Sequence, residues 1–265
     1  MSLPITRYPA FSDYFEGLSA LQFRHASTVT RHHDRAKGSL GQYKEVDPDA
    51  ERREWDTTGR TISELTAKAA TSGPYKFTHL TPVQAAVFDY LPRLSDPYNP
   101  NAPPDESEPP PRDILVKAKT GTGKTAAFVV PAIEQRVKVL EAVGEQALVD
   151  SGLPKDKFNM STVVKNYARE NVGVLIISPT RELATQIAKE ASNLAHYRRG
   201  MCVQLLIGGS SKHHQMRTWM TKPRDIVVAT PGRLRDFLAS ERAFGTAFDN
   251  TSLVCKPSGV STVTS

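Results

Sequence analysis

The octapeptide AKTGTGKT, residues 118–125, carries the residue types that bind a phosphate chain. Gly121 and Gly123 permit backbone angles that other residues resist, so that successive N–H groups can turn toward one anion. Lys124 adds a positive charge for the β- and γ-phosphates of a nucleotide, and the Thr125 hydroxyl can bind Mg²⁺. We therefore predict a nucleotide-phosphate site in which Lys124 and Thr125 are the catalytic residues and Thr125 holds the metal through the nucleotide.

Two further segments, SPTRE and ATPGR, each leave an apolar run and enter a helical pattern. The hydroxyls of Thr180 and Thr230, the side chains of Arg181 and Arg233 and the backbone N–H groups there can contact phosphates. Such contacts ignore base identity, so they predict sequence-independent, salt-sensitive binding to a single strand. Taken alone, Thr-Pro-Gly is an ordinary turn and Arg181 a surface charge. Their order behind the glycine-rich segment favours the binding role.

Alternating strands and helices must position these residues. The predicted strands cover residues 113–118, 173–178, 202–207 and 225–229. The predicted helices cover 61–70, the later part of 77–94, the segment after 125, 181–197, 213–220 and 233–240. Strands separated by helices imply an α/β fold with a parallel sheet flanked by helices on both faces. Residues 141–170, in which Gly144, Gly152 and Pro154 lie among polar residues, are predicted to be an inserted surface excursion.

Two segments lie outside this alternation. Residues 1–60 lack sustained periodicity, which predicts a disordered N-terminal extension. Within it, LQFRHASTVTRHH bears Arg and Ser and no acid, as in a mitochondrial presequence, whereas Asp13 and Glu16 are unfavourable in one. The localisation stays open between mitochondrial and otherwise intracellular, nuclear or cytoplasmic. Residues 97–111 hold seven prolines in fifteen positions, which predicts an extended surface loop.

Composition and charge restrict the class of protein. The 265 residues are 39% apolar, enough for a core, but the apolar runs are far shorter than the roughly 20 residues that cross a bilayer. Cys202 and Cys255 lack metal-type spacing, so we expect reduced thiols and no disulfide-linked partner. We also expect a monomer. Residues 113–265 carry 21 Lys and Arg against 13 Asp and Glu, whereas residues 1–112 carry 13 against 15. This asymmetry favours a polyanionic partner for the second part.

Five stretches in this order resemble the DEAD-box RNA helicases. AKTGTGKT resembles motif I, with Ala118 where the general phosphate-loop pattern has glycine, and FTHLTPVQ resembles the Q motif. PTRELATQ resembles motif Ia, GG at 208–209 the paired glycines, and TPGR motif Ib. The resemblance covers residues 61–253 and implies the first of the family's two RecA-like P-loop domains, incomplete at its C-terminus. Residues 254–265 form a tail without resemblance.

The resemblance implies ATP and Mg²⁺ as cofactors and RNA as the partner, bound through its backbone. The Gln84 carboxamide would pair with adenine N6 and N7. Phe77 would lie near the base, whereas the family's more distant upstream aromatic has no clear counterpart. The implied ATP-binding residues are Phe77, Thr81, Gln84, Ala118, Lys119, Thr120, Gly121, Thr122, Gly123, Lys124 and Thr125. The implied RNA-binding residues are Pro179, Thr180, Arg181, Gly208, Gly209, Thr230, Pro231, Gly232 and Arg233.

One part of the family pattern is missing. In the family, Asp-Glu-Ala-Asp at the end of a core strand holds Mg²⁺ and orients water for ATP hydrolysis. Here FDNTSLV is followed by CKPSGVSTVTS, and the adjacent pair Asp105–Glu106 lies in the proline-rich segment. We therefore expect hydrolysis and unwinding at background level for this chain. A sheet without that strand would expose an apolar edge, so we also expect marginal stability.

The main prediction is an ATP-dependent RNA helicase, an ATP-hydrolysing enzyme, represented by its ATP-binding domain. A P-loop kinase or small GTPase would account for Lys124 and Thr125 but not for LTPVQ, PTRELA and TPGR. It would also lack the preference for adenine over guanine that Gln84 implies. A non-catalytic RNA- and nucleotide-binding fragment stays open as an alternative. Such a fragment would still bind RNA after Lys124→Ala and would show no ATPase activity.

Overall fold

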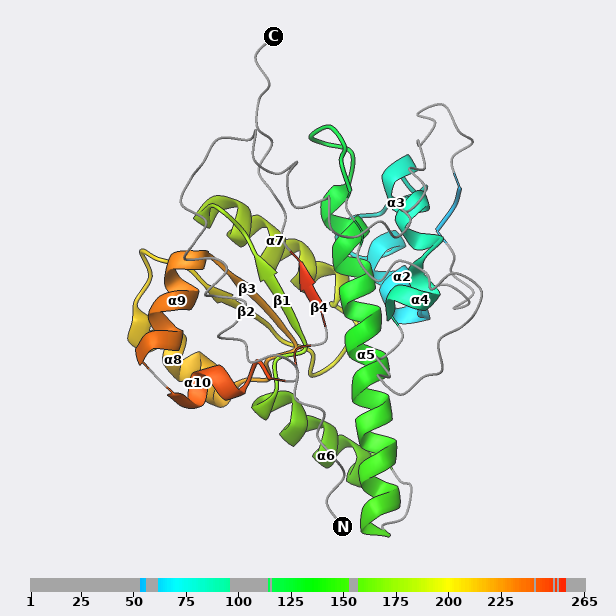
Figure 1. The fold of residues 1–265 in the computed structure, drawn as a ribbon. Helices are drawn as coiled ribbons and strands as arrows, with labels where there is room; N and C mark the ends of the chain where they lie inside the picture. Colours follow the sequence, from blue (N-terminus) through cyan, green and yellow to red (C-terminus); the bar gives the residue numbers. More distant parts are fainter. Residues whose placement is uncertain are drawn as a thin grey trace, which may run out of the picture. The chain divides into compact units, whose positions relative to one another are not determined.

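The structure is a computed structural model, and Figure 1 shows its fold. It describes residues 53–55, 62–95, 114, 116–152, 157–240, 242–249, 251 and 253–255, all within the unit Val46–Ser265. The unit Met1–Glu45, with the candidate presequence, lies outside the described residues, as does the proline-rich segment 97–111. Within the described part, no helix combines the length and the apolar composition that a membrane crossing requires.

The described strands form a four-stranded parallel sheet. They are β1 (Val174–Ile177), β2 (Val203–Leu206), β3 (Ile226–Ala229) and β4 (Leu253–Cys255), in the order β2-β3-β1-β4. Val174 of β1 is in register with Ile226 on one side and with Leu253 on the other. Strands of a parallel sheet are buried on both faces, which explains the unbroken apolar runs VLII and IVVA. The predicted α/β fold with a parallel sheet is confirmed.

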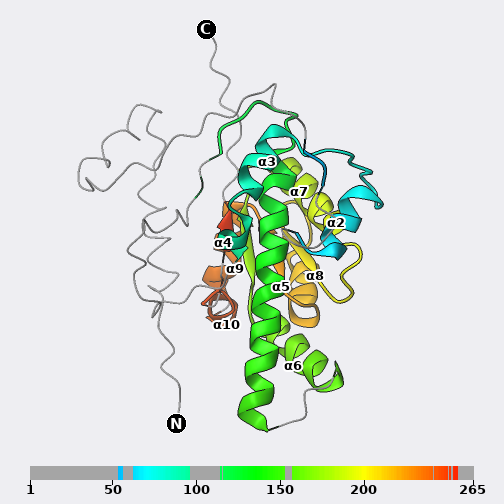
Figure 2. The same cartoon turned by 90° about the vertical axis from the view of Figure 1, so that its right-hand side faces the viewer.

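Helices cover both faces of the sheet (Figures 1 and 2). On one face lie α5 (Lys124–Ser151) and α7 (Arg181–Leu194), and α2 (Glu64–Thr71), α3 (Pro82–Phe88) and α4 (Leu91–Ser95) pack against α5. On the other face lie α8 (Lys212–Thr221), α9 (Pro231–Ser240) and α10 (Arg242–Thr246). This division follows from right-handed crossovers, because the connection from β1 to β2, which contains α7, crosses the sheet in one direction. The connections from β2 to β3 and from β3 to β4, which contain α8, α9 and α10, cross it in the other direction.

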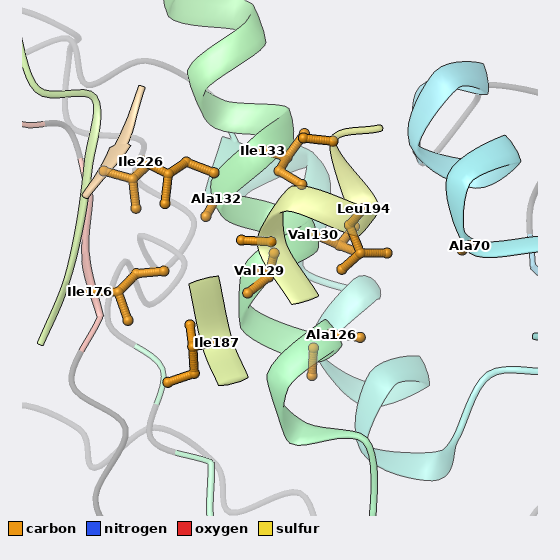
Figure 3. Packing of buried hydrophobic residues seen from close by; sticks show 14 of the residues in the cluster. Ala70, Ala126, Val129, Val130, Ala132, Ile133, Ile176, Ile187, Leu194 and Ile226 are labelled. Carbon is orange, nitrogen blue, oxygen red and sulfur yellow. The ribbon is translucent and has the colours of Figure 1, made fainter. Parts of the chain in front are cut away.

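The core between α5, α7 and the sheet consists of small and branched apolar side chains (Figure 3). The residues labelled there are Ala126, Val129, Val130, Ala132, Ile133, Ile176, Ile187, Leu194 and Ile226, and Ala70 belongs to α2 on the other side of α5. The opposite side has an aromatic cluster instead. The ring centroid of Phe244 in α10 lies 4.1 Å from that of Trp219 in α8 and 5.0 Å from that of Phe237 in α9. The sheet is thus packed by helices on both of its faces.

The predicted strand at 113–118 is wrong for the residues described there. Ile114 and residues 116–119 have no strand conformation, and the side chains of Ile114 and Val116 are 37% and 39% exposed. A strand requires a neighbour that pairs with its N–H and C=O groups. No described residue pairs with this segment, so its apolar sequence alone does not make it a strand.

The surface excursion predicted at 141–170 consists mostly of helix, which its glycine-bearing polar sequence did not indicate. Helix α5 continues to Ser151, and α6 (Lys157–Glu170) packs back against it. A Cβ atom at Gly144 would lie 3.0 Å from Val164 Cγ2 and 3.1 Å from Met160 Sδ, so glycine allows the two helices to approach closely. Gly152 caps α5 with φ of 64°, in the left-handed region. The glycines therefore mark a helix contact and a helix end.

The core strand that we expected to be missing is present as β4. Leu253 and Val254 are in register with Val174 and Leu175 of β1, and Cys255 with Ile176. The expected boundary between the family domain and the tail, at 253 and 254, therefore runs through a strand. A three-residue strand forms here because β1 offers an unpaired row of backbone groups, which depends little on side-chain type. This edge of β1 is consequently covered.

Candidate functional site

The glycine-rich segment forms a turn that leads into α5. Gly121 and Gly123 have φ of 78° and 77°, the left-handed region that favours glycine, and Gly123 is the N-cap of the helix. The Lys124 ammonium donates to the carbonyl oxygen of Ala118 at 2.7 Å and also to that of Lys119. The lysine charge therefore lies inside the loop, next to a helix N-terminus. This arrangement fits a polyphosphate, since both features attract an anion.

Helix α3 contacts this loop through Gln84. A Cβ atom at Gly123 would lie 2.6 Å from Gln84 Nε2 and 3.2 Å from Thr81 Oγ1, so only glycine fits there. Gln84 Nε2 donates to the Gly123 carbonyl oxygen at 3.2 Å. Thr81 and Gln84 also form a capping box, with Thr81 N donating to Gln84 Oε1 at 3.0 Å. The Q-motif residues therefore bind the phosphate loop directly.

The Gln84 carboxamide keeps capacity for a ligand. An amide oxygen has two lone pairs and an amide NH₂ has two donors, of which the Thr81 N–H and the Gly123 carbonyl use one each. The free lone pair and the free N–H are what adenine N6 and N7 require. The side chain is only 3% exposed, so burial and these two bonds hold it in one orientation. The geometry is compatible with the role that the sequence resemblance implies.

A hollow of about 370 Å³ lies along residues 76–82, which precede and begin α3. Phe77 lines it and stacks on Tyr75, with ring centroids 4.7 Å apart. Trp55 stacks on the Phe77 ring at 6.0 Å and meets Phe88 edge-on at 5.6 Å. Trp55 is 4% exposed. The predicted disorder is therefore wrong for residues 53–55, the only described part of 1–60.

Trp55 is an aromatic residue upstream of Phe77 that the sequence analysis did not single out. Sequence reasoning missed it because residues 51–60 are otherwise polar and show no periodicity. The available signal was the tryptophan itself, since a large apolar ring in a polar segment usually finds a packing partner. Glu54 forms an antiparallel bridge with His79, and Leu80 N–H donates to the Arg53 carbonyl at 2.7 Å. Backbone hydrogen bonds thus connect residues 53–55 to the loop that lines the hollow.

Thr125 lies beside a carboxylate that sequence reasoning did not single out. Glu190 of α7 shares a hydrogen bond with the Thr125 hydroxyl. Burial raises the pKa of the Glu190 carboxyl, and the bond to Thr125 partly opposes that shift. A hydroxyl and a carboxylate are both hard oxygen ligands of the kind that Mg²⁺ prefers. The residues around Thr125 therefore suit Mg²⁺ on a bound nucleotide.

The second group of predicted residues gathers at the carboxyl ends of three strands. Thr180 follows β1 and caps α7, its hydroxyl accepting from Leu183 N at 3.2 Å. Thr230 follows β3, and its N–H donates to the Leu206 carbonyl of β2 at 3.0 Å. Pro231 begins α9. Each motif leaves a strand and enters a helix, as the sequence predicts. Because the strands are parallel, the turns meet at one sheet edge.

The turn of residues 208–211, between β2 and α8, joins this group through the two arginines. An added Cβ at Gly208 would lie 2.8 Å from Arg181 Nη2, and one at Gly209 would lie 2.7 Å from Arg181 Nη1. Arg233 Nη2 donates to the Ser210 carbonyl oxygen at 3.0 Å. The three motifs are therefore in contact with one another, which their spacing along the chain does not reveal.

Comparison with known proteins adds independent information. The family model for DEAD/DEAH box helicases matches residues 104–255. DEAD-box ATP-dependent RNA helicase 25 of Oryza sativa subsp. japonica is 40% identical over 135 residues, which cover 51% of this chain and 19% of the relative. DEAD-box ATP-dependent RNA helicase 48 of the same organism is 32% identical over 264 residues, covering 88% of this chain and 28% of the relative. The chain thus spans a fifth to a third of the length of these relatives.

The crystal structure of the yeast DEAD-box splicing factor Prp28 has the same fold in its matching part. The TM-score is 0.53 with 22% sequence identity, and the match covers 77% of this chain and 38% of that one. This likeness supports the α/β architecture described above. At this level of sequence identity, the similarity concerns the fold.

Proposed function

Because the chain belongs to the DEAD/DEAH box helicase family, we propose that it is the ATP-binding part of an ATP-dependent RNA helicase. The two relatives described above carry that name. The contact that carries the proposal is the bond from Gln84 to Gly123, because it joins an adenine-reading carboxamide to a phosphate-binding loop. An enzyme that binds only phosphate does not need a contact between an adenine-reading carboxamide and the phosphate-binding loop.

The nucleotide half of the proposal assigns one task to each group. The loop N–H groups and Lys124 hold the β- and γ-phosphates, Gln84 pairs with adenine, and Thr125 holds Mg²⁺. When bound, Mg²⁺ supplies charge neutralisation on the phosphate oxygens. Phe77 lies on the side of the site that would bind the base, and its ring stacks on those of Tyr75 and Trp55. Adenine is thus selected by hydrogen bonds and the triphosphate by charge.

The RNA half of the proposal rests on the sheet edge. The turns after β1, β2 and β3 present Thr180, Arg181, the glycine pair and Thr230 together. Groups of this kind bind phosphate and sugar and carry no base preference. We therefore propose a single strand of RNA as the ligand, bound with equal affinity whatever its sequence. Mitochondrial localisation and a monomeric state remain further proposals.

Calorimetric titration of the 265-residue chain with ATP and Mg²⁺ tests the nucleotide half. Lys124→Ala removes a charge-assisted contact and is expected to weaken ATP binding by at least about tenfold. Lys189→Ala is the matched control, because Lys189 is exposed in α7. GTP is expected to bind more weakly than ATP in wild type, and Gln84→Ala to reduce the difference. Equal affinity of the wild type for ATP and GTP would contradict the adenine-reading role.

A second candidate function is a nucleotide- and RNA-binding module without turnover. The observation that favours it is the sequence after β4, Lys256-Pro257-Ser258, in place of Asp-Glu-Ala-Asp. A phosphate-release assay with ATP and single-stranded RNA separates the two candidates. Release at the rate of the buffer blank, with both ligands bound, supports the module. Release well above that blank, and lost in Lys124→Ala, supports a hydrolytic function of this chain.

A further inference from the structure

Two arginines from different helices reach the same turn, residues 208–211. Arg181 begins α7 and Arg233 lies in the first turn of α9, and both were predicted to contact phosphate. Their surroundings differ. Arg181 is exposed, whereas the side chain of Arg233 is 12% exposed. Arg181 is therefore available to a ligand, whereas Arg233 is already bound within the protein.

The Arg181 guanidinium lies on the glycine pair. All three nearest atoms to an added Cβ at Gly208 belong to this guanidinium: Nη2 at 2.8 Å, Cζ at 3.1 Å and Nε at 3.2 Å. Real Cβ atoms do not approach other atoms so closely, so an alanine at 208 would displace the arginine. Gly208 has no positive φ, and its backbone would accept alanine. The space for Arg181 is therefore what requires glycine at this position.

The Arg181 N–H groups donate to no described residue. Resting on two glycines, the guanidinium is held by contact alone and keeps its hydrogen-bonding face for a ligand. Arginine loses much rotamer freedom when it binds, and a surface that restricts it beforehand reduces that loss. A planar donor that is held but unpaired is suited to a phosphate oxygen pair.

Arg233 is engaged on several sides. Its Nη2 donates to the Ser210 carbonyl at 3.0 Å, and its Nη1 donates to Gln215 Oε1 at 3.4 Å. Its Nε lies 3.9 Å from Asp236 Oδ2, and its guanidinium lies over the Phe237 ring at 5.9 Å. These contacts join the start of α9 to the turn and to α8. Because of these contacts, few N–H donors of Arg233 remain for a ligand.

We propose that Gly208 and Gly209 form a seat that positions Arg181 for an RNA phosphate, and that Arg233 fastens the seat without contacting RNA. This inference rests on the proposed RNA-binding function. It changes two roles that the family resemblance implies, since the glycines act through Arg181 rather than by admitting the RNA backbone. Arg233 becomes a positioning residue, and Arg181 supplies the cation.

The seat can be tested without RNA by nuclear magnetic resonance. ¹⁵N relaxation of arginine Nε–Hε groups measures how mobile each guanidinium is in the 265-residue chain. Arg181 is expected to be more ordered than Arg235, which is exposed in α9, and to become as mobile as Arg235 in Gly208→Ala. Arg233 is expected to be the most ordered of the three. Equal mobility of Arg181 and Arg235 in the wild type would overturn the seat.

Binding of a fluorescent single-stranded oligouridine, measured at several salt concentrations, tests the roles of the two arginines. Arg181→Ala is expected to weaken binding about tenfold and to lower the salt slope by about 0.7, the loss of one phosphate contact. Gly208→Ala and Arg233→Ala are each expected to weaken binding several-fold. Both effects are expected to vanish when Arg181 is already alanine. Arg235→Ala is the matched charge control.

The outcomes separate this inference from the proposed function. Wild type that binds no oligouridine contradicts the RNA-binding function, and the relaxation experiment then decides on the seat alone. Arg233→Ala that weakens binding equally with or without Arg181 would make Arg233 a ligand and overturn its positioning role. Gly208→Ala that weakens binding in the Arg181→Ala background would mean that the glycine itself faces RNA. Coupling of both variants to Arg181 supports the inference.

Discussion

At the residue scale, Gln84 joins segments that lie 39 positions apart in the chain. Its backbone and side chain complete the capping box with Thr81, and its amide nitrogen binds the Gly123 carbonyl. The same side chain is predicted to read adenine. Because a helix cap, a loop contact and a ligand contact depend on one carboxamide, the stability of the loop and the choice of base are coupled there.

Gln84→Ala is therefore expected to lower the free energy of unfolding even without nucleotide. The loss of a cap interaction and of one buried hydrogen bond together corresponds to about 2 kcal/mol. Urea unfolding followed by circular dichroism measures it. Gln186→Ala, at an exposed position of α7, is the control and is expected to change stability by less than about 0.5 kcal/mol. Equal effects of the two variants would show that the carboxamide contributes nothing to the loop.

At the element scale, β4 shows how backbone pairing with a neighbouring strand can form a strand that the side-chain pattern does not predict. Its three residues align with β1 and extend the sheet by one strand. Cys255 lies in the last position, packs against the core cluster, and has the pKa of its thiol raised by burial to about 12. Helix α6, which packs against α5, was missed for a related reason, because the glycine-bearing polar sequence did not indicate a helical hairpin.

Alkylation of Cys255 tests the presence of β4. At pH 8 the partly buried thiol stays protonated, and only the thiolate reacts, so iodoacetamide is expected to modify it at least about tenfold more slowly than in urea. The measurement uses Cys202→Ala, which leaves one cysteine. Modification in the native protein as fast as in urea would mean that residues 253–255 do not pair with β1.

At the scale of the whole described unit, a buried ion pair ties α5 to the sheet. Arg136 Nε donates to Asp225 Oδ1 at 2.9 Å, and both side chains are at most 1% exposed. Asp225 Oδ2 accepts from Cys202 N at 2.9 Å, at the start of β2, and Arg136 Nη2 donates to the Asn171 carbonyl before β1. One pair of charges therefore fixes the amino ends of three neighbouring strands against the longest described helix.

Asp225→Asn is expected to destabilise the unit by about 3–5 kcal/mol, because it leaves the buried Arg136 charge uncompensated. The double variant Arg136→Met with Asp225→Leu is expected to recover much of that loss, since apolar side chains replace both charges. Urea midpoints measure both. Asp236→Asn, which breaks the exposed pair with Lys212, is the control and is expected to leave the midpoint nearly unchanged. Similar midpoints for Asp225→Asn and wild type would contradict a structural role for the pair.

The sequence by itself determined the features that depend on near neighbours in the chain. The turns that bear Lys124, Thr180 and Thr230, the helices that follow them and the strands before Thr180 and Thr230 were readable, because periodicity, glycine and capping residues act within a few positions. Only the tertiary structure decided which distant groups touch. Trp55 against Phe77 and Arg181 against the glycine pair depend on strand order and helix packing, which bring together segments that no local pattern connects.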